Sequence, residues 1–335
     1  MKKTQFVKDL KDKDSIQSPF LIKFSALGVG KTGKAFMNFV LMDKTGEIEA
    51  RLWEDAERYA GQAVRDALVS IEGRCQVYQG RRQIVVNKIQ VLREDEVELK
   101  DFLVESPNDP ELLYGQLKAY VSTMKDPDYK ALAESILIED SDIIDRIKRA
   151  PAAKSVHHAY PGGLIEHVVS ITGILDHLAG HYGHYVNRDL LFLGGFFHDI
   201  GKLWELSYDR VTDYTNEGKL IGHLVMGVEL IDKKIRELEA QPGRLASKFP
   251  EEKKLLVKHL ILAHHGQLEY GSPKRPKCLE ALLVHMIDDL DSKVNAIRTF
   301  IEKDETPGQW TALSRQYERY FFKPSWALPG ESDEG

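Results

Sequence analysis

The chain of 335 residues, with a mass of 38.1 kDa, is long enough for about two domains of ordinary size. Its 42% apolar and 29% charged residues exclude wholesale disorder, its apolar runs are too short for a membrane helix, and its two cysteines exclude a disulfide framework. The net charge of −6 is unevenly distributed, because residues 1–92 sum to +5 and the remainder to −11, which favours two modules with different electrostatic roles.

The first module, residues 1–92, shows the alternation that is typical of β-strands. Apolar and polar residues alternate on both sides of a turn at 43–46, and further strand-like runs cover 20–27, 68–78 and 82–91. A helix-compatible stretch at 56–64 separates the third strand from the fourth. This layout predicts a small all-β barrel of the OB type. Six side chains of the second and third strands should point inward: Met37, Phe39, Leu41, Ile48, Ala50 and Leu52.

The sequence changes character after the barrel. Residues 93–111 carry eight carboxylates and two cations and contain prolines, so we expect an acidic linker. Residues 112–325 follow a period of 3.6 and predict an all-α domain, and we expect residues 326–335 to be a disordered tail. Helices are expected near 110–124, 128–137, 141–149, 164–182, 188–205, 219–238, 251–265, 277–302 and 310–321.

Residues suited to metal binding are concentrated in the helical half. All 12 histidines lie between 157 and 285, and an acidic run follows at 288–291. Divalent metals favour neutral imidazole and carboxylate ligands, and one carboxylate can bridge two ions. An isolated His-Asp pair would indicate a hydrogen-bonded core pair, but this number of candidates favours a metal site. Five histidines and one aspartate stand out by context: His167, His198, Asp199, His223, His264 and His265.

These residues carry a resemblance to a known family. His167, the pair His198-Asp199 and Asp288 resemble the signature of HD-domain metal-dependent phosphohydrolases, with Phe-His-Asp-Ile-Gly-Lys at 197–202 as the central motif. With the barrel in front, and with His-His-Gly-Gln-Leu-Glu-Tyr-Gly-Ser-Pro at 264–273, the chain resembles the YhaM family of 3′→5′ exoribonucleases over roughly residues 15–305.

The resemblance implies a ligand set and two divalent ions. Mn²⁺ is favoured, with Mg²⁺, Fe²⁺ or Ni²⁺ as alternatives. Asp289 competes with Asp288 for the same role, and we expect Asp291 to be solvated or to support a ligand. Lys202 would offset charge on the phosphate, and Asp199 would bridge the ions. One ion would be held by His167, His198, Asp199 and Asp288, and the other by Asp199, His223, His264 and His265.

Two further groups are candidates for substrate binding. His157 and His158 precede the first ligand and could contact phosphate or protonate the leaving group; the alternative is a polar loop. Phe36, Asn38, Arg51 and Trp53 should face outward on the barrel strands where OB folds bind nucleic acid. The alternative for Trp53 is packing against the neighbouring helix or the other domain. His259 and His285 carry no motif, and we expect them to be structural.

The favoured function is a metal-dependent 3′→5′ exoribonuclease that hydrolyses single-stranded RNA by a two-metal mechanism, with single-stranded DNA left open as a further substrate. The expected location is the cytoplasm, without a secretory signal or a membrane partner, and assembly into a homo-oligomer is left open. Two alternatives remain at this point. One is a phosphohydrolase of free nucleotides or cyclic dinucleotides. The other is a non-catalytic protein that binds nucleic acid or has a regulatory role.

Overall fold

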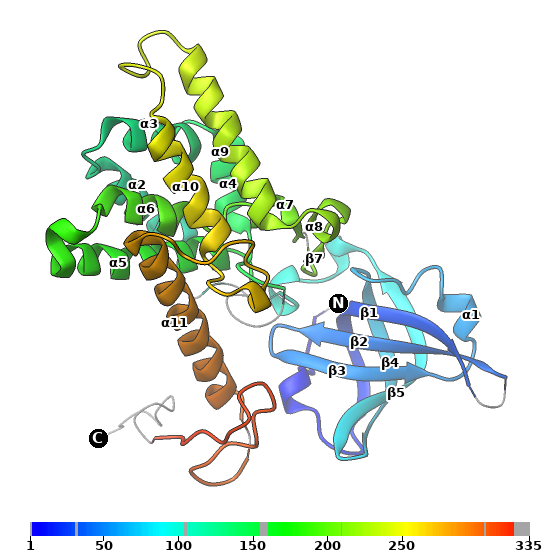
Figure 1. The fold of residues 1–335 in the computed structure, drawn as a ribbon. Helices are drawn as coiled ribbons and strands as arrows, with labels where there is room; N and C mark the ends of the chain where they lie inside the picture. Colours follow the sequence, from blue (N-terminus) through cyan, green and yellow to red (C-terminus); the bar gives the residue numbers. More distant parts are fainter. Residues whose placement is uncertain are drawn as a thin grey trace, which may run out of the picture. The chain divides into compact units, whose positions relative to one another are not determined.

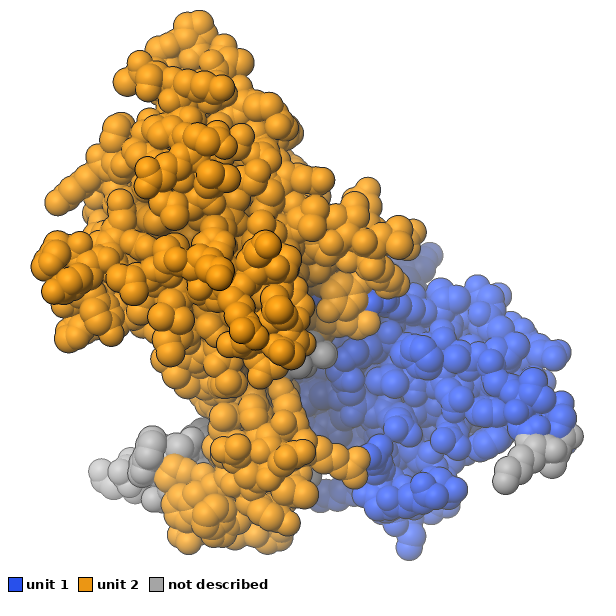
Figure 2. Space-filling model, in the orientation of Figure 1, with its two compact units in different colours: residues 1–107, 207–213 blue, residues 108–206, 214–335 orange. Residues whose placement is uncertain are grey.

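The computed structural model describes residues 2–30, 33–103, 106, 108–154, 160–208, 210–304 and 306–324. The chain divides into two compact units, which Figure 2 shows in different colours. The first unit comprises residues 1–107 and 207–213, and the second comprises residues 108–206 and 214–335. The helical half of the sequence therefore contains a short segment, 207–213, that belongs to the first unit. The expected tail at 326–335 lies outside the described residues.

The first unit is a closed five-stranded barrel, as the sequence predicted (Figure 1). The strands are joined in the order β1-β2-β3-β5-β4, and all neighbours are antiparallel except β3 and β5. The expected helix between the third and fourth strands is present but short, α1 (Ala56–Tyr59). The strands are β1 (Ser15–Val29), β2 (Ala35–Asp43), β3 (Gly46–Leu52), β4 (Leu68–Tyr78) and β5 (Arg81–Leu92).

The barrel core follows the alternation of β2 and β3. All six side chains that were expected to point inward are buried and belong to one apolar cluster. Because successive side chains of a strand point to opposite faces, their neighbours on the same strands face outward. Burial of the six side chains thus confirms the predicted alternation, and the opposite face of β2 and β3 is the one that faces away from the barrel core.

Part of the expected acidic linker packs on the barrel instead of connecting freely. Two short 3₁₀ helices, Glu94–Glu96 and Leu99–Asp101, follow β5. Phe102 is buried in a small cluster with Leu21, Leu68 and Leu92 of the barrel. The apolar residues between the carboxylates explain this packing. Burying their side chains is favourable enough to hold the segment on the barrel, although its charged neighbours favour contact with water.

The second unit is built mainly of helices, as predicted. Besides them, β6 (Leu206–Ser207) and β7 (Asp213–Tyr214) form a small two-stranded sheet. Its central helix, α6, is apolar on every side, and each residue from 189 to 197 is buried. Among the described residues, no helix combines the length and apolarity that crossing a membrane requires. The helices are α2 (Pro110–Ser122), α3 (Pro127–Leu137), α4 (Ser141–Arg149), α5 (Gly163–Tyr182), α6 (Arg188–Phe197), α7 (Lys202–Glu205), α8 (Asn216–Leu220), α9 (His223–Ala240), α10 (Glu251–Ala263) and α11 (Leu279–Glu302).

Three expected helices differ from the structure. The segment 188–205 is broken between α6 and α7, and 219–238 is broken at Gly222, whose φ of 80° favours glycine. The prediction of a helix at 310–321 is wrong. This stretch folds back on itself through bridges that join Trp310 to Phe322 and Ser314 to Arg319. Each of the first two breaks lies next to a histidine of the site described below.

Candidate metal centre

Two groups of potential metal ligands lie in the helical unit. His167, His198 and Asp288 form the first, and His223, His264 and His265 form the second. Within each group, the ligand atoms all lie within 4.8 Å of one another. The groups are assembled from the side of α5, the side of α11, the ends of α6 and α10, and the start of α9. Segments more than a hundred residues apart thus converge, although no local pattern required them to do so.

Asp199 lies between the two groups and faces both. Its Oδ2 is 3.4 Å from His198 Nε2 and 3.9 Å from His167 Nε2. Its Oδ1 is 3.6 Å from His223 Nε2 and 3.5 Å from His264 Nε2. A carboxylate in this position can ligate one ion through each oxygen.

Each of the five histidines is held through Nδ1, which leaves Nε2 directed into the site. A backbone carbonyl only accepts hydrogen bonds, so an imidazole paired with one must donate its Nδ1–H. Metal-binding histidines are typically oriented by such a hydrogen bond. The Nδ1 partners are Asp291 Oδ2 for His167 at 2.8 Å, the Gly194 and Gly195 carbonyls for His198, Glu205 Oε1 for His223 at 2.9 Å, the Ile261 carbonyl for His264 and the Tyr270 carbonyl for His265.

Two of these partners are carboxylates. The sequence left the role of Asp291 open and gave no role to Glu205. Asp291, one turn after Asp288 on α11, is buried and also accepts a hydrogen bond from Ser170 Oγ. Glu205, at the end of α7, is buried and accepts from both Nδ1 and the backbone N–H of His223. Its position three residues after Lys202 was the only sequence signal for it, and that signal is weak.

A glycine allows the second group to approach Asp199. A Cβ atom at Gly201 would lie 2.0 Å from the His223 carbonyl oxygen, so only glycine permits this backbone contact. Gly201 lies in the turn that separates α6 from α7, two residues after Asp199. This glycine, in the break of the expected helix 188–205, therefore lets the start of α9 pack closely against the turn that follows Asp199.

The chemistry of the donor atoms fits a cation. Among the described residues, Asp199 Oδ1 and His223 Nε2 are buried and make no hydrogen bond. Leaving such atoms unpaired costs about 1–3 kcal/mol each unless another partner compensates. The two atoms lie 3.6 Å apart, on the side of Asp199 that faces the second group. A divalent ion there would satisfy them.

The pKa shifts in the site reflect the charged groups that are gathered there. Burial favours the neutral imidazole of His167, but hydrogen bonds to Asp288 and Asp291 outweigh it and raise the pKa to about 9. Burial opposes ionisation of Asp199, but Lys202 and His198 outweigh it and lower the pKa. Burial and the neighbouring imidazoles lower the pKa of His265 to about 4. The first group therefore attracts positive charge, which a metal ion in place of a proton would supply.

The structure separates the two competing aspartates of α11, Asp288 and Asp289. Asp288 Oδ1 is 3.3 Å from His167 Nε2, whereas Asp289 forms an exposed ion pair of 2.7 Å with Lys293. Lys202 begins α7 and is not on a continuous helix with His198, because the expected helix 188–205 is broken between them. Its Nζ donates to Asp199 Oδ2 at 2.6 Å, and Asp199 raises the pKa of Lys202 against the opposing effect of burial.

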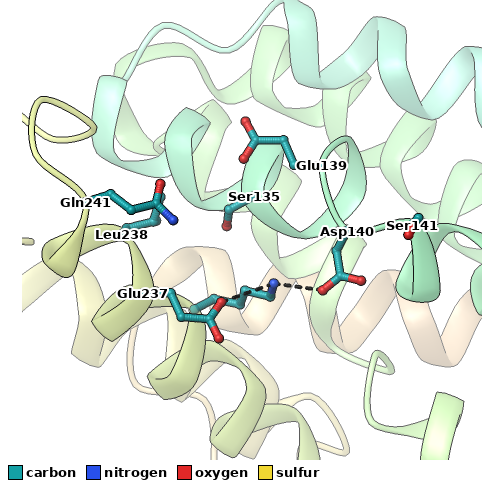
Figure 3. Close-up of a pocket in the computed structure, with 8 residues that line it drawn as sticks. Ser135, Glu139, Asp140, Ser141, Glu237, Leu238 and Gln241 are labelled. Atoms are coloured by element: carbon teal, nitrogen blue, oxygen red, sulfur yellow. Dashed lines mark hydrogen bonds and ion pairs between the residues drawn. The ribbon is translucent and has the colours of Figure 1, made fainter.

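A pocket of ≈ 260 Å³ opens beside the ligands. It is lined by Asp199, Lys202, His264, His265 and Asp288, and also by Tyr270, His285, Asp289 and Ser292. His285, expected to be structural, donates to the His264 carbonyl at 2.7 Å and lines this pocket. Figure 3 shows a different pocket, of ≈ 330 Å³, whose buried Lys234 pairs with Asp140 and Glu237 and which contains none of the ligands.

The remaining candidates lie elsewhere. His157 and His158 fall outside the described residues. On the barrel, the rings of Phe36 and Trp53 are stacked, with centroids 5.0 Å apart, and the Arg51 guanidinium lies 5.9 Å from the Trp53 ring. Asn38 pairs with Arg51 across β2 and β3. These four residues thus form one outward patch on the barrel, as alternation predicted.

Comparisons with known proteins follow the same two-part division. The HD domain family matches residues 164–293, and the OB-fold nucleic acid binding domain family matches residues 21–92. Together with the site, these matches identify a protein of the HD-domain class that carries an OB-fold module. A relative from Halalkalibacterium halodurans, the 3′-5′ exoribonuclease YhaM, is 34% identical over 318 residues, which cover 94% of this chain and 95% of the relative. The chain belongs to the YhaM family.

Two of the solved structures that match the chain cover short parts of it. The second OB-fold domain of replication protein A from Methanococcus maripaludis is 16% identical, and the match covers 28% of this chain and 97% of that domain with a TM-score of 0.23. A single-stranded DNA-binding domain from Synechococcus sp. is 12% identical, covers 24% of this chain and 96% of that one, and has a TM-score of 0.21. Similarity at this level carries no further conclusion.

Proposed function

We infer that the chain is a metal-dependent 3′→5′ exoribonuclease that hydrolyses phosphodiester bonds of single-stranded RNA. The observation that carries this inference is the position of Asp199 between two sets of imidazole and carboxylate ligands. Family membership over nearly the whole length supports the same activity. The alternatives, a hydrolase of small nucleotides and a non-catalytic binding protein, lack a comparable observation in their favour.

We propose that the site holds two divalent ions, with Mn²⁺ as the favoured one because imidazoles outnumber carboxylates among the ligands. His167, His198 and Asp288 would hold one ion, His223, His264 and His265 the other, and Asp199 both. Bound ions would supply the Lewis acidity that phosphoryl transfer requires.

Two features of the chain's own residues support the reaction. The Lys202 ammonium lines the pocket and is held by Asp199, so it is placed to offset negative charge on a phosphate oxygen. On the barrel, the Phe36-Trp53 stack with Arg51 beside it offers a ring for a base and a cation for a phosphate. We propose that this face binds the single strand, with single-stranded DNA as a second substrate, and that the enzyme acts in the cytoplasm.

One assay tests the function against its alternatives. RNA labelled at its 5′ end is incubated with the full chain and Mn²⁺. We expect a ladder that shortens from the 3′ end. Turnover of nucleotides without RNA cleavage would indicate the small-substrate hydrolase, and retention of uncleaved RNA would indicate the binding protein.

The Asp199→Ala variant tests the bridging role. Because this substitution removes the carboxylate shared by both ligand groups, we expect hydrolysis to be lost while binding of RNA by the barrel stays within a factor of two or so. Fluorescence anisotropy of a labelled RNA measures the binding. Hydrolysis at the wild-type rate by this variant, after removal of contaminating nucleases, would contradict the proposal.

A further inference from the structure

A basic segment follows the pocket residue Tyr270 along the chain, in an otherwise acidic half of the sequence. Lys274, Arg275 and Lys277 are exposed and lie within 272–278, a stretch without a carboxylate. Within the part of the chain that the structure describes, none of the three side chains forms an ion pair. We call residues 274–277 the basic loop. Since residues 93–335 carry a net charge of −11, a cluster of three cations without ion pairs is unusual in this part of the chain.

The backbone of the basic loop is anchored at both ends. On one side, the buried Ser272 hydroxyl lies 2.9 Å from the Leu262 carbonyl oxygen and 2.7 Å from that of Lys274. On the other, the Lys277 N–H donates to His259 Nε2 at 2.9 Å. Two prolines stiffen the segment further. Three cations are thus presented to solvent from a fixed backbone, which lowers the entropic cost of binding an anion.

The loop is connected to the pocket on both sides. Tyr270 precedes it, lines the pocket and is 70% exposed, and its carbonyl orients His265. α11 follows it and contributes His285 and Asp288 to the same pocket. Asp288 lies nine residues into this helix, so the start of α11 is about 14 Å from it along the axis. This separation is within the span of a few nucleotides.

We propose that Tyr270 and the basic loop form a second binding site for single-stranded nucleic acid, which holds the nucleotides just upstream of the 3′ end. The loop cations would contact phosphates, and the exposed ring of Tyr270 would stack on a base. This inference rests on the proposed function, because it assumes that the 3′ end enters the pocket. It assigns part of the strand binding to the helical domain itself.

The test compares two substrates of the full chain. In the triple variant Lys274→Ala/Arg275→Ala/Lys277→Ala, we expect KM for a 20-nucleotide RNA to rise at least about tenfold, with kcat little changed. The slope of log(kcat/KM) against log salt should become flatter by about 2, since each phosphate contact to a single strand contributes roughly 0.7. Hydrolysis of a dinucleotide, which is too short to reach the loop, should stay unchanged.

A matched control removes the same charge elsewhere on the domain. Lys233, Arg236 and Lys248 are exposed, and the first two lie ten or more residues after His223, at least about 15 Å away along α9. The triple alanine variant at these positions should retain the wild-type KM and salt slope. An effect equal to that of the loop variant would mean that only net charge matters and would overturn the inference.

The outcomes separate this inference from the proposed function. If the wild type does not shorten RNA, the proposed function fails, whatever the variants do. If the wild type is active and the loop variant keeps its KM and its salt slope, only the second site fails. Loss of dinucleotide hydrolysis in the loop variant would show that the loop is a structural part of the pocket, and would also refute the inference. Tyr270→Ala should also weaken binding of the long RNA.

Discussion

The Asp291→Asn substitution tests how the site orients its ligands. Asp291 is buried and accepts hydrogen bonds from His167 Nδ1 at 2.8 Å and from Ser170 Oγ at 2.7 Å. Asparagine keeps the shape and one accepting oxygen but removes the negative charge behind the imidazole. Losing such a partner typically lowers metal affinity or activity 10- to 100-fold, or about 1.4–2.8 kcal/mol. Because the ligands themselves remain, we expect the defect to appear mainly in metal affinity.

The assay is a Mn²⁺ titration of the initial rate on 5′-labelled RNA. For Asp291→Asn, we expect the half-saturating Mn²⁺ concentration to rise 10- to 100-fold and most of the rate to return at saturation. Asp142→Asn is a suitable control, since Asp142 is an exposed residue of α4 that does not line the pocket. Thermal unfolding of both variants excludes a general loss of structure. A wild-type Mn²⁺ dependence in Asp291→Asn would refute the orienting role.

Three further predictions concern other residues of the two units. Asp288→Ala should abolish RNA hydrolysis, whereas Asp289→Ala should keep most of it, and equal rates in the two variants would contradict the difference in their contacts. Gly28→Ala should weaken RNA binding in an anisotropy titration but leave folding intact, because its Cβ would lie 2.9 Å from a ring carbon of Phe36; unchanged affinity would exclude Phe36 from the binding face. Lys3 is buried with a pKa lowered by burial to about 8, so the unfolded chain binds more protons between pH 8 and 10.5. The free energy of unfolding should therefore gain about 3 kcal/mol across this window, and denaturant titrations of Lys3→Met should lack that gain.

The sequence was sufficient for properties that depend on neighbouring residues. The period of two in β2 and β3 identified the inward side chains, such as Met37 and Phe39, because strand geometry sends alternate residues to opposite faces. The motif at 197–202 and the clustering of histidines identified the kind of chemistry. The order of a barrel followed by a helical domain then followed from element types and spacing, and the family matches have the same order.

Tertiary structure alone decided how the ligand side chains are directed. Asp288 and Asp289 differ by one position, about 100° around a helix, and only the packing of α11 on α5 determines which of them meets His167. The break after Phe197 and the use of Glu205 to orient His223 depend on the approach of α9, which no local pattern encodes. The physical reason is that periodicity describes a residue relative to its own helix, whereas a metal site depends on atoms from several helices, whose crossing is set by the packing of the whole core.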